Sequence, residues 1–309
     1  MKTFRLFLIL AVLPLFAGST KAADSNQDII YVSSAKFTWP LIEKWVSEYV
    51  RQNPGVRIQW VDKSSADNNS KEIDLSFVTG DESGVQAGKD IAVGRFAILP
   101  ITTKENPLYG QIVKKKFGKK ELRNLFFAED LLQEEENGKK NPLQSKLTVY
   151  TGNGSASGSL LFASFFGFSP SNFRGKRISG DDIFLLNAIQ KDSTGVTFNN
   201  LSYIFDLNDR RLKDEIALLP LDVKKEQLQA LRSENLDETL ALLEQQHVEL
   251  IPVHPIEVVY TEKDHVKDFL KWIITDGQKY NHEYGFLNPD EKTFVYQKKR
   301  LETSLLTNN

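Results

Sequence analysis

The first part of the chain alternates short apolar runs with one segment of helical periodicity. Residues 29–33 and 73–78 are compact apolar runs, and 56–61 is a third run rich in β-branched and aromatic side chains. Over 41–52 apolar side chains recur every three or four residues, until Asn53 opens an Asn-Pro-Gly sequence that breaks the pattern. The order strand, helix, strand, strand predicts an α/β fold.

The rest of the chain continues this alternation. The long apolar run 90–102 predicts a strand that crosses between two lobes, and 248–261, which carries Pro252 and Pro255, predicts a strand bent at a second crossing. Residues 129–146 are polar and charged, which predicts a solvated loop. Further strands are predicted at 147–150 and 195–198, and further helices at 118–127, 160–168, 179–191, 237–246 and 264–284.

The N-terminal 22 residues have the features of a signal peptide. Lys2 and Arg5 precede an apolar run over 6–16, and Thr20 and Ala22 place small side chains at a cleavage site. The apolar run is too short to span a bilayer, so a membrane anchor is not expected. The mature protein should therefore begin near Ala23 and be periplasmic or secreted.

Composition narrows the class of protein. Removing the signal peptide removes three bases and no acids, which leaves 36 bases against 41 acids and a net charge of −5. Such a chain is not drawn to nucleic acid or anionic membranes by its overall charge. The sequence contains no cysteine, which excludes disulfides, a thiol nucleophile and a lipidated N-terminus. The remaining 287 residues suffice for two lobes.

A stretch of small residues follows the predicted strand 147–150. Residues 152–159 contain only Gly, Asn, Ser and Ala and precede a predicted helix. Ser155 or Ser157 could cap this helix, whose free N–H groups could then face an anion. No Gly-Lys-Ser/Thr sequence closes the stretch as in a nucleotide-binding loop, and a flexible turn with an ordinary serine cap explains it equally well.

The same geometry occurs near the start of the chain. The predicted strand 29–33 is followed by a polar turn, Thr38 and Pro40, and then by the helix 41–52. Two helix N-termini, one from each half, could therefore point at a common cleft, as expected for an anion held between lobes.

Four segments of the chain resemble the phosphate-binding members of the periplasmic solute-binding proteins of ABC transporters. They are 36–45, 73–78, 154–157 and 269–286, the last with its Gly-Gln-Lys-Tyr sequence at 277–280. The resemblance implies an α/β protein with the type II periplasmic-binding fold, in which two α/β lobes are joined by two crossing strands. Lobe one would comprise 23–99 and 253–309, and lobe two 100–252.

The resemblance also implies a ligand site, from which this chain departs in several places. A first loop would contribute Lys36, Phe37 and Thr38, and a second Ser64 or Ser65. Lys36 stands where the family has a threonine. Thr79 stands where the family has an aspartate that accepts the phosphate proton, so weak discrimination between phosphate and sulfate is expected. A third loop would contribute Gly154, Ser155, Ala156 and Ser157, while Thr151 and Asn153 replace the family's Arg and Asp.

The function implied is capture of a small inorganic anion such as phosphate in an interlobe cleft by hinge closure. The resemblance further implies an inner-membrane ABC permease as partner, no cofactor and a monomer. An alternative is a binding-protein fold reused as an envelope interaction module with a degenerate ligand site, and a neutral or cationic ligand is a third possibility.

Other candidate residues favour structural roles. The four histidines lack zinc-ligand spacing, and no Ser/His/acid set indicates an enzyme. Asp181 and Asp182 predict a helix N-cap. Arg95 in the predicted crossing strand is either a surface partner or a cation of the cleft.

We predict that export removes the first 22 residues. The mass of the intact protein recovered from the periplasm or the medium should correspond to a chain beginning at or near Ala23. A mature protein that retains Met1 would contradict the signal peptide.

Overall fold

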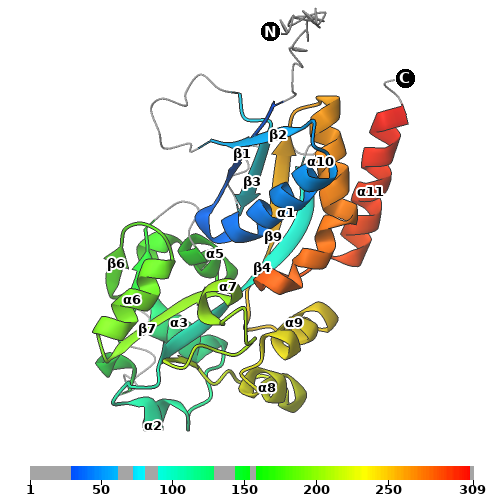
Figure 1. Cartoon of the computed structure of the whole chain (residues 1–309). Helices are drawn as coiled ribbons and strands as arrows, with labels where there is room; N and C mark the ends of the chain where they lie inside the picture. The colour runs from blue at the N-terminus through cyan, green and yellow to red at the C-terminus, as the bar shows by residue number, and fades with distance from the viewer. Residues whose placement is uncertain (1–28, 62–71, 81–89, 129–142, 154–157, 307–309) are drawn as a thin grey trace, which may run out of the picture.

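The structure, a computed structural model, describes residues 29–61, 72–80, 90–128, 143–153 and 158–306. The predicted signal peptide, Ser64, Ser65 and the loop Gly154, Ser155, Ala156 and Ser157 lie outside the described residues. Two α/β lobes lie one above the other, and a long strand runs from one into the other (Figure 1).

Lobe one is built on a five-stranded part of the sheet. Its strand order is β2-β1-β3-β9-β4, with β1 parallel to β2 and β3, and β9 antiparallel to β3 and β4. Its strands are β1 (Ile29–Ser34), β2 (Arg57–Trp60), β3 (Leu75–Thr79), β9 (Val253–Tyr260) and the first part of β4 (Asp90–Thr103), and its helices are α1 (Trp39–Gln52), α10 (Asp264–Thr275) and α11 (Glu291–Leu306).

Lobe two is built on the second half of β4. That half pairs antiparallel with β7 and β8, and β5 lies parallel between β7 and β6. The remaining strands are β5 (Thr148–Gly152), β6 (Lys176–Ile178), β7 (Gly195–Asn200) and β8 (Ile216–Leu218). The helices are α2 (Tyr109–Ile112), α3 (Lys119–Phe126), α5 (Gly158–Phe165), α6 (Ile183–Lys191), α7 (Leu201–Ile204), α8 (Lys225–Arg232) and α9 (Leu236–Gln245).

The two lobes meet where β4 changes partners. β4 pairs with β9 up to Ala97 and with β7 from Ile98 onward. The Ile98 N–H donates to the carbonyl of Pro252 at 3.0 Å, directly before β9 begins, so the two crossing segments are hydrogen-bonded to each other. The lobe boundaries at 99/100 and 252/253 remain a prediction about which residues move together.

Each lobe has an aromatic core. In lobe one Trp45 is fully buried beside Phe77, and Tyr49 of α1 contacts Phe269 of α10 with ring centroids 4.7 Å apart. In lobe two Phe162 of α5 stacks on Phe198 of β7 at 4.0 Å. Helices α1 and α5, the two that begin at the predicted anion loops, are therefore fixed to their sheets by packing.

One predicted helix is shorter than its pattern suggested. The helix predicted over 264–284 ends at Thr275 and gives way to two 3₁₀ turns, Gly277–Tyr280 and His282–Tyr284. The Trp45 indole donates to the carbonyl of Gly277 at 2.8 Å, and the Gln278 amide donates to the carbonyl of Ile273 at 2.8 Å. These two carbonyls accept hydrogen bonds from side chains, where in a continuing helix they would accept them from backbone N–H groups four residues later. The helix therefore ends there.

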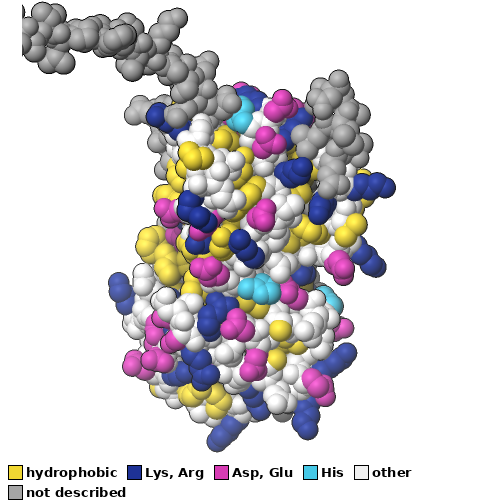
Figure 2. All heavy atoms as spheres, turned by 45° about the vertical axis from the view of Figure 1, so that its right-hand side comes forward, with side chains coloured by type: hydrophobic (Ala, Val, Ile, Leu, Met, Phe, Trp, Pro, Cys, Tyr) yellow, Lys and Arg dark blue, Asp and Glu magenta, His cyan; other side chains and the backbone are white. Residues whose placement is uncertain are grey.

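The remaining predicted helices and strands are present where described, with their ends shifted by a few residues. Helices α8 and α11 and the short elements α2, α7, β6 and β8 were not predicted; the short ones have only three or four residues, too few to show a period. Within the described residues, no helix combines the length and the apolar character needed to span a bilayer. Basic and acidic side chains are interspersed over the face drawn in Figure 2.

Candidate functional site

The sheet of lobe two has a topological switch point beside α5. The chain leaves β5 toward β6 and returns to β7 on the other side of β5, which is the arrangement at whose carboxyl strand ends open α/β sheets bind ligands. Helix α5 begins at this edge. The Ser159 hydroxyl in its first turn accepts a hydrogen bond from the Gly152 N–H at 2.7 Å, which fixes the helix start to the end of β5.

Lobe one has the corresponding point at the end of β1, which lies between β2 and β3. The predicted loop residues follow it as a 3₁₀ turn that leads into α1. Lys36 is exposed, whereas Phe37 is buried against Phe96 with ring centroids 4.8 Å apart. The Thr38 hydroxyl donates to the carbonyl of Ala35 at 2.8 Å, so its proton is used within the turn.

The first turn of α5 is where lobe one touches lobe two. Gly80 follows β3 with φ +79°, and a Cβ at this position would lie 2.5 Å from Cδ2 of Leu161. The ring of His254, at the start of β9, hydrogen-bonds the backbone of Leu161. A cleft between the lobes would therefore close on this turn.

Four buried side-chain atoms around this turn have no hydrogen-bond partner in the described structure. Asp182 and His254 contact the turn directly. Thr79 and Thr151 each precede a glycine, Gly80 or Gly152, that contacts it. A buried polar atom without a partner is uncommon in native proteins and costs free energy unless a ligand or water satisfies it. The four atoms are Thr79 Oγ1, Thr151 Oγ1, Asp182 Oδ1 and His254 Nε2.

Asp182 brings a carboxylate to the start of α5. Its side chain is only 9% exposed, and Oδ2 accepts a hydrogen bond from the Gly158 N–H at 2.6 Å while Oδ1 has no partner. Burial is the main cause that raises the pKa of Asp182 to about 6; the Gly158 N–H opposes the shift, and the nearby Asp181 adds a smaller contribution in the same direction as burial. The Asn199 amide donates to the backbone carbonyl of Asp182 at 2.7 Å and so helps to hold the residue in place.

The predicted N-cap pair therefore has two different roles. Asp181 accepts the Ile183 N–H at 3.0 Å and the Tyr203 hydroxyl at 2.8 Å, so it caps α6 as predicted. For Asp182 the prediction was wrong, because its side chain makes no cap bond to α6 and turns to α5 instead. The sequence offered no signal for this contact, since the partner N–H is 24 residues away.

The other predicted site residues are placed only in part. Thr79 is 3% exposed at the end of β3, next to the Gly80 contact. Arg95 is not a cation of the cleft in this structure, because its Nε donates to the carbonyl of Asn288 at 2.7 Å. Ser64, Ser65, Gly154, Ser155, Ala156 and Ser157 lie outside the described residues, so their contribution to a site remains a prediction.

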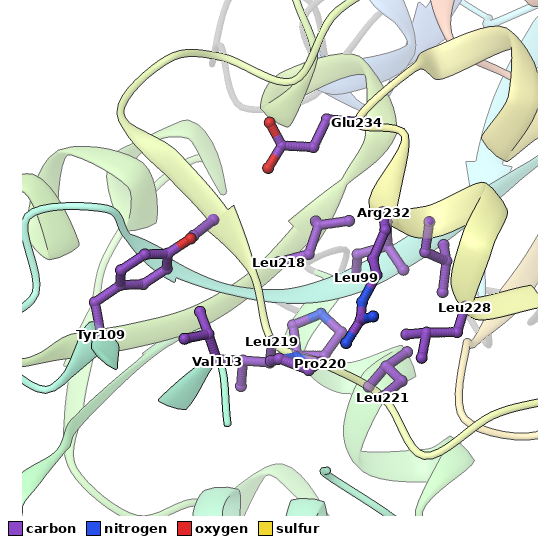
Figure 3. A pocket seen from close by; sticks show the side chains of 13 residues that line it. Leu99, Tyr109, Val113, Leu218, Leu219, Pro220, Leu221, Leu228, Arg232 and Glu234 are labelled. Carbon is purple, nitrogen blue, oxygen red and sulfur yellow. The ribbon is translucent and has the colours of Figure 1, made fainter. Parts of the chain in front are cut away.

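A separate cavity of about 280 Å³ lies elsewhere in lobe two, between α2, β8 and α8 (Figure 3). Its walls are mainly leucine and proline, with Tyr109, Arg232 and Glu234 among the lining residues. It shares no lining residue with the switch point beside α5. We take the turn at the start of α5, which four buried polar residues contact or adjoin, as the candidate site in preference to this cavity.

No family profile and no curated protein matches the sequence. Solved structures do match the fold. An ABC-type phosphate transport receptor from Vibrio cholerae is 13% identical, with a TM-score of 0.56 over 85% of this chain and 100% of that one. A protein assigned as a phosphate ABC transporter substrate-binding protein from Clostridium perfringens, solved with bound phosphate, is 17% identical, with a TM-score of 0.57 over 84% and 99%. The chain has the type II periplasmic-binding fold.

A third structure, of a protein from Planctomyces limnophilus assigned as phosphate-binding, is 11% identical with a TM-score of 0.50 over 90% of this chain and 99% of that one. At these identities the likeness concerns the fold alone. The fold class expected from the sequence is confirmed.

We predict that Asp182→Asn changes how stability depends on pH. The folded state raises the pKa of Asp182 from its ordinary 3.8 to about 6, so ionising this carboxyl costs folding free energy as pH rises through this interval. The difference in the free energy of unfolding, variant minus wild type, should therefore increase by up to about 3 kcal/mol between pH 4 and pH 7. Above pH 7 the difference should stay constant.

Urea unfolding at a series of pH values measures this difference. The exposed Asp214→Asn in the same lobe is the matched control and should show no such gain. If the difference in the free energy of unfolding between wild type and Asp182→Asn does not vary with pH, burial does not raise the pKa of Asp182 and the prediction is wrong.

Proposed function

We propose that the protein is an extracytoplasmic solute-binding protein that captures a small oxyanion between its two lobes. Phosphate is the first candidate ligand. The observation that supports this most directly is the set of four unpartnered polar atoms around the first turn of α5, where the lobes meet. Three structures of the same fold carry phosphate in their names, which agrees with the proposal. Delivery to an inner-membrane ABC permease is part of the same proposal.

Binding would close the lobes over the start of α5. In the proposed site, Ser155 and Ser157 donate hydroxyl hydrogen bonds, and the free N–H groups before α5 face the anion. Thr79 from lobe one and Thr151 from lobe two carry hydroxyls that can donate to the same ligand. Because the groups come from both lobes, the ligand would bind the closed arrangement more tightly than the open one and shift the equilibrium toward it.

Asp182 sets a condition on the ligand. A buried carboxylate with a free oxygen repels an anion that can only accept hydrogen bonds, but it can accept a proton carried by the ligand. Phosphate carries such a proton near neutral pH, and sulfate does not. We therefore propose that Asp182 supplies the discrimination that Thr79 does not.

One observation favours the alternative function, an envelope interaction module with a degenerate ligand site. The Gly158 N–H, which an anion at the start of α5 would use, is already bonded to Asp182, and no ion pair in the described part of the chain neutralises this carboxylate. If no oxyanion, sugar or amino acid raises the melting temperature, the interaction module becomes the better explanation.

We predict that Ser155→Ala combined with Ser157→Ala abolishes the rise in melting temperature that phosphate causes in the wild type. The ligand-free double variant should lose only a helix cap, about 1 kcal/mol. Differential scanning fluorimetry with and without phosphate measures both effects. A full phosphate shift in the double variant would show that this loop is an ordinary turn.

We also predict that the wild type binds phosphate more than about tenfold more tightly than sulfate, a difference above about 1.4 kcal/mol. Asp182→Asn should bring the two dissociation constants together, mainly by improving sulfate binding, because the amide can donate to sulfate. Calorimetric titration of both proteins with both anions tests this. Equal affinities of the wild type for phosphate and sulfate would show that Asp182 does not contact the bound anion.

A further inference from the structure

The two lobes are also joined at a second place, away from α5. The turn that follows α10 in lobe one lies against α7 and α9 of lobe two. Gly285, with φ +78°, approaches α7 so closely that a Cβ would lie 3.2 Å from both the N and the Cα of Ser202. Around this contact, charged side chains of lobe two bind the turn directly.

Arg210 of lobe two is a bridge to this turn. Its guanidinium donates to the carbonyl of His282 at 2.8 Å and to the carbonyl of Glu283 at 3.0 Å, and Asp237 of α9 holds it at 2.6 Å. The backbone of Arg210 has φ 63°, a left-handed conformation that costs a non-glycine residue free energy. The hydrogen bonds from the Arg210 side chain to lobe one offset the free-energy cost of this backbone conformation.

Glu244 of α9 makes the second bridge. Its Oε1 accepts a hydrogen bond from the Asn288 N–H at 2.7 Å and lies 2.8 Å from Nε2 of His282. Burial opposes the ionisation of Glu244, but the bonds from His282 and Asn288 outweigh burial and lower its pKa. The carboxylate of lobe two is therefore bound by two groups of lobe one.

The surroundings of His282 show which of its atoms carries a proton. The Asn288 side-chain nitrogen is assigned 3.1 Å from Nε2, while the Asn288 Oδ1 is buried without a partner in the described structure. Nε2 cannot donate to Glu244 and accept from Asn288 together. Rotating the Asn288 amide by half a turn gives Oδ1 a donor and leaves Nε2–H between two acceptors.

We propose that Arg210, Glu244 and His282 form an interlobe clasp, which stabilises the arrangement of the two lobes seen in this structure and weakens when His282 loses its proton. The charged groups that act on His282 are Glu244 and Asp237 of α9 and the Arg210 guanidinium, while Arg95 of β4 acts on Glu244. The role of the clasp in ligand affinity rests on the proposed function, whereas its effect on lobe closure does not.

The direction of the pH dependence follows from the contacts. The hydrogen bond to Glu244 raises the pKa of His282, burial and Arg210 oppose this, and Asp237 supports it. Protonation therefore favours the clasped state fully below the ordinary pKa of histidine, 6.5, and this contribution is lost as pH rises through the raised value. As the pH rises, the ratio of clasped to unclasped protein should fall. The fall should be up to about tenfold for each unit by which the pKa of His282 differs between these two states.

The experiment measures the distance between the lobes in the ligand-free, full mature chain. Because the sequence has no cysteine, Lys191→Cys in α6 and Lys271→Cys in α10, both exposed, give one spin label on each lobe. Electron–electron distance measurements should show one short distance at pH 5.5 and a growing longer component at pH 8.5.

His282→Gln and Glu244→Gln should each make this distance distribution independent of pH and shift it toward the longer component. His247→Gln, an exposed histidine close to the end of α9, is the matched control and should behave as wild type. NMR titration of the wild-type histidines provides a measurement that needs no stable variant, and His282 should lose its raised pKa in Glu244→Gln.

A wild-type distance distribution that is the same at both pH values would overturn the clasp, as would a pH dependence retained in His282→Gln. The proposed function fails separately, if no oxyanion raises the melting temperature while the distance still responds to pH. The clasp fails alone if phosphate binds and the distance does not respond.

Discussion

The whole architecture depends on one strand that both lobes share. β4 is 14 residues long, and its two halves pair with strands of different lobes within one nine-stranded sheet. Pro100 sits in this strand opposite Phe198 of β7, and its carbonyl accepts the Leu219 N–H at 3.0 Å. With the predicted lobe boundaries, we expect any change in the relative orientation of the lobes to bend β4 and the neighbouring 252/253 link. The Ile98–Pro252 hydrogen bond joins these two segments.

This constraint explains why polar groups gather at the first turn of α5. The turn lies beside the crossing, so Gly158 approaches the side chain of Ile98 in β4, and Leu161 meets both Gly80 and His254. Packing alone would favour apolar atoms in so crowded a place. Within the described residues four polar atoms there have no partner, which costs free energy and agrees with the proposed ligand site.

The fold could be predicted from the sequence because apolar periodicity and breaker residues are local signals. The helix after 29–33, the long run that became β4 and the alternation of helix and strand from α3 to β5, α5, α6 and β7 follow from such patterns. The end of α10 could not be predicted, because it depends on Trp45, 232 residues from its partner Gly277. The role of Asp182 is a similar case. Its identity suggested a cap, whereas its carboxylate is directed to α5 by packing that only the fold determines.

The candidate site and the clasp respond to acidity in the same direction for different reasons. Asp182 is a buried carboxyl whose ionisation costs free energy, so folding is favoured below its pKa of about 6. His282 is a base whose protonated form is stabilised by Glu244, so the interlobe contact is also favoured at lower pH. Both groups affect global unfolding, because each has a raised pKa in the folded protein. The comparison of wild type with Asp182→Asn isolates the first effect, and a measurement of lobe separation isolates the second.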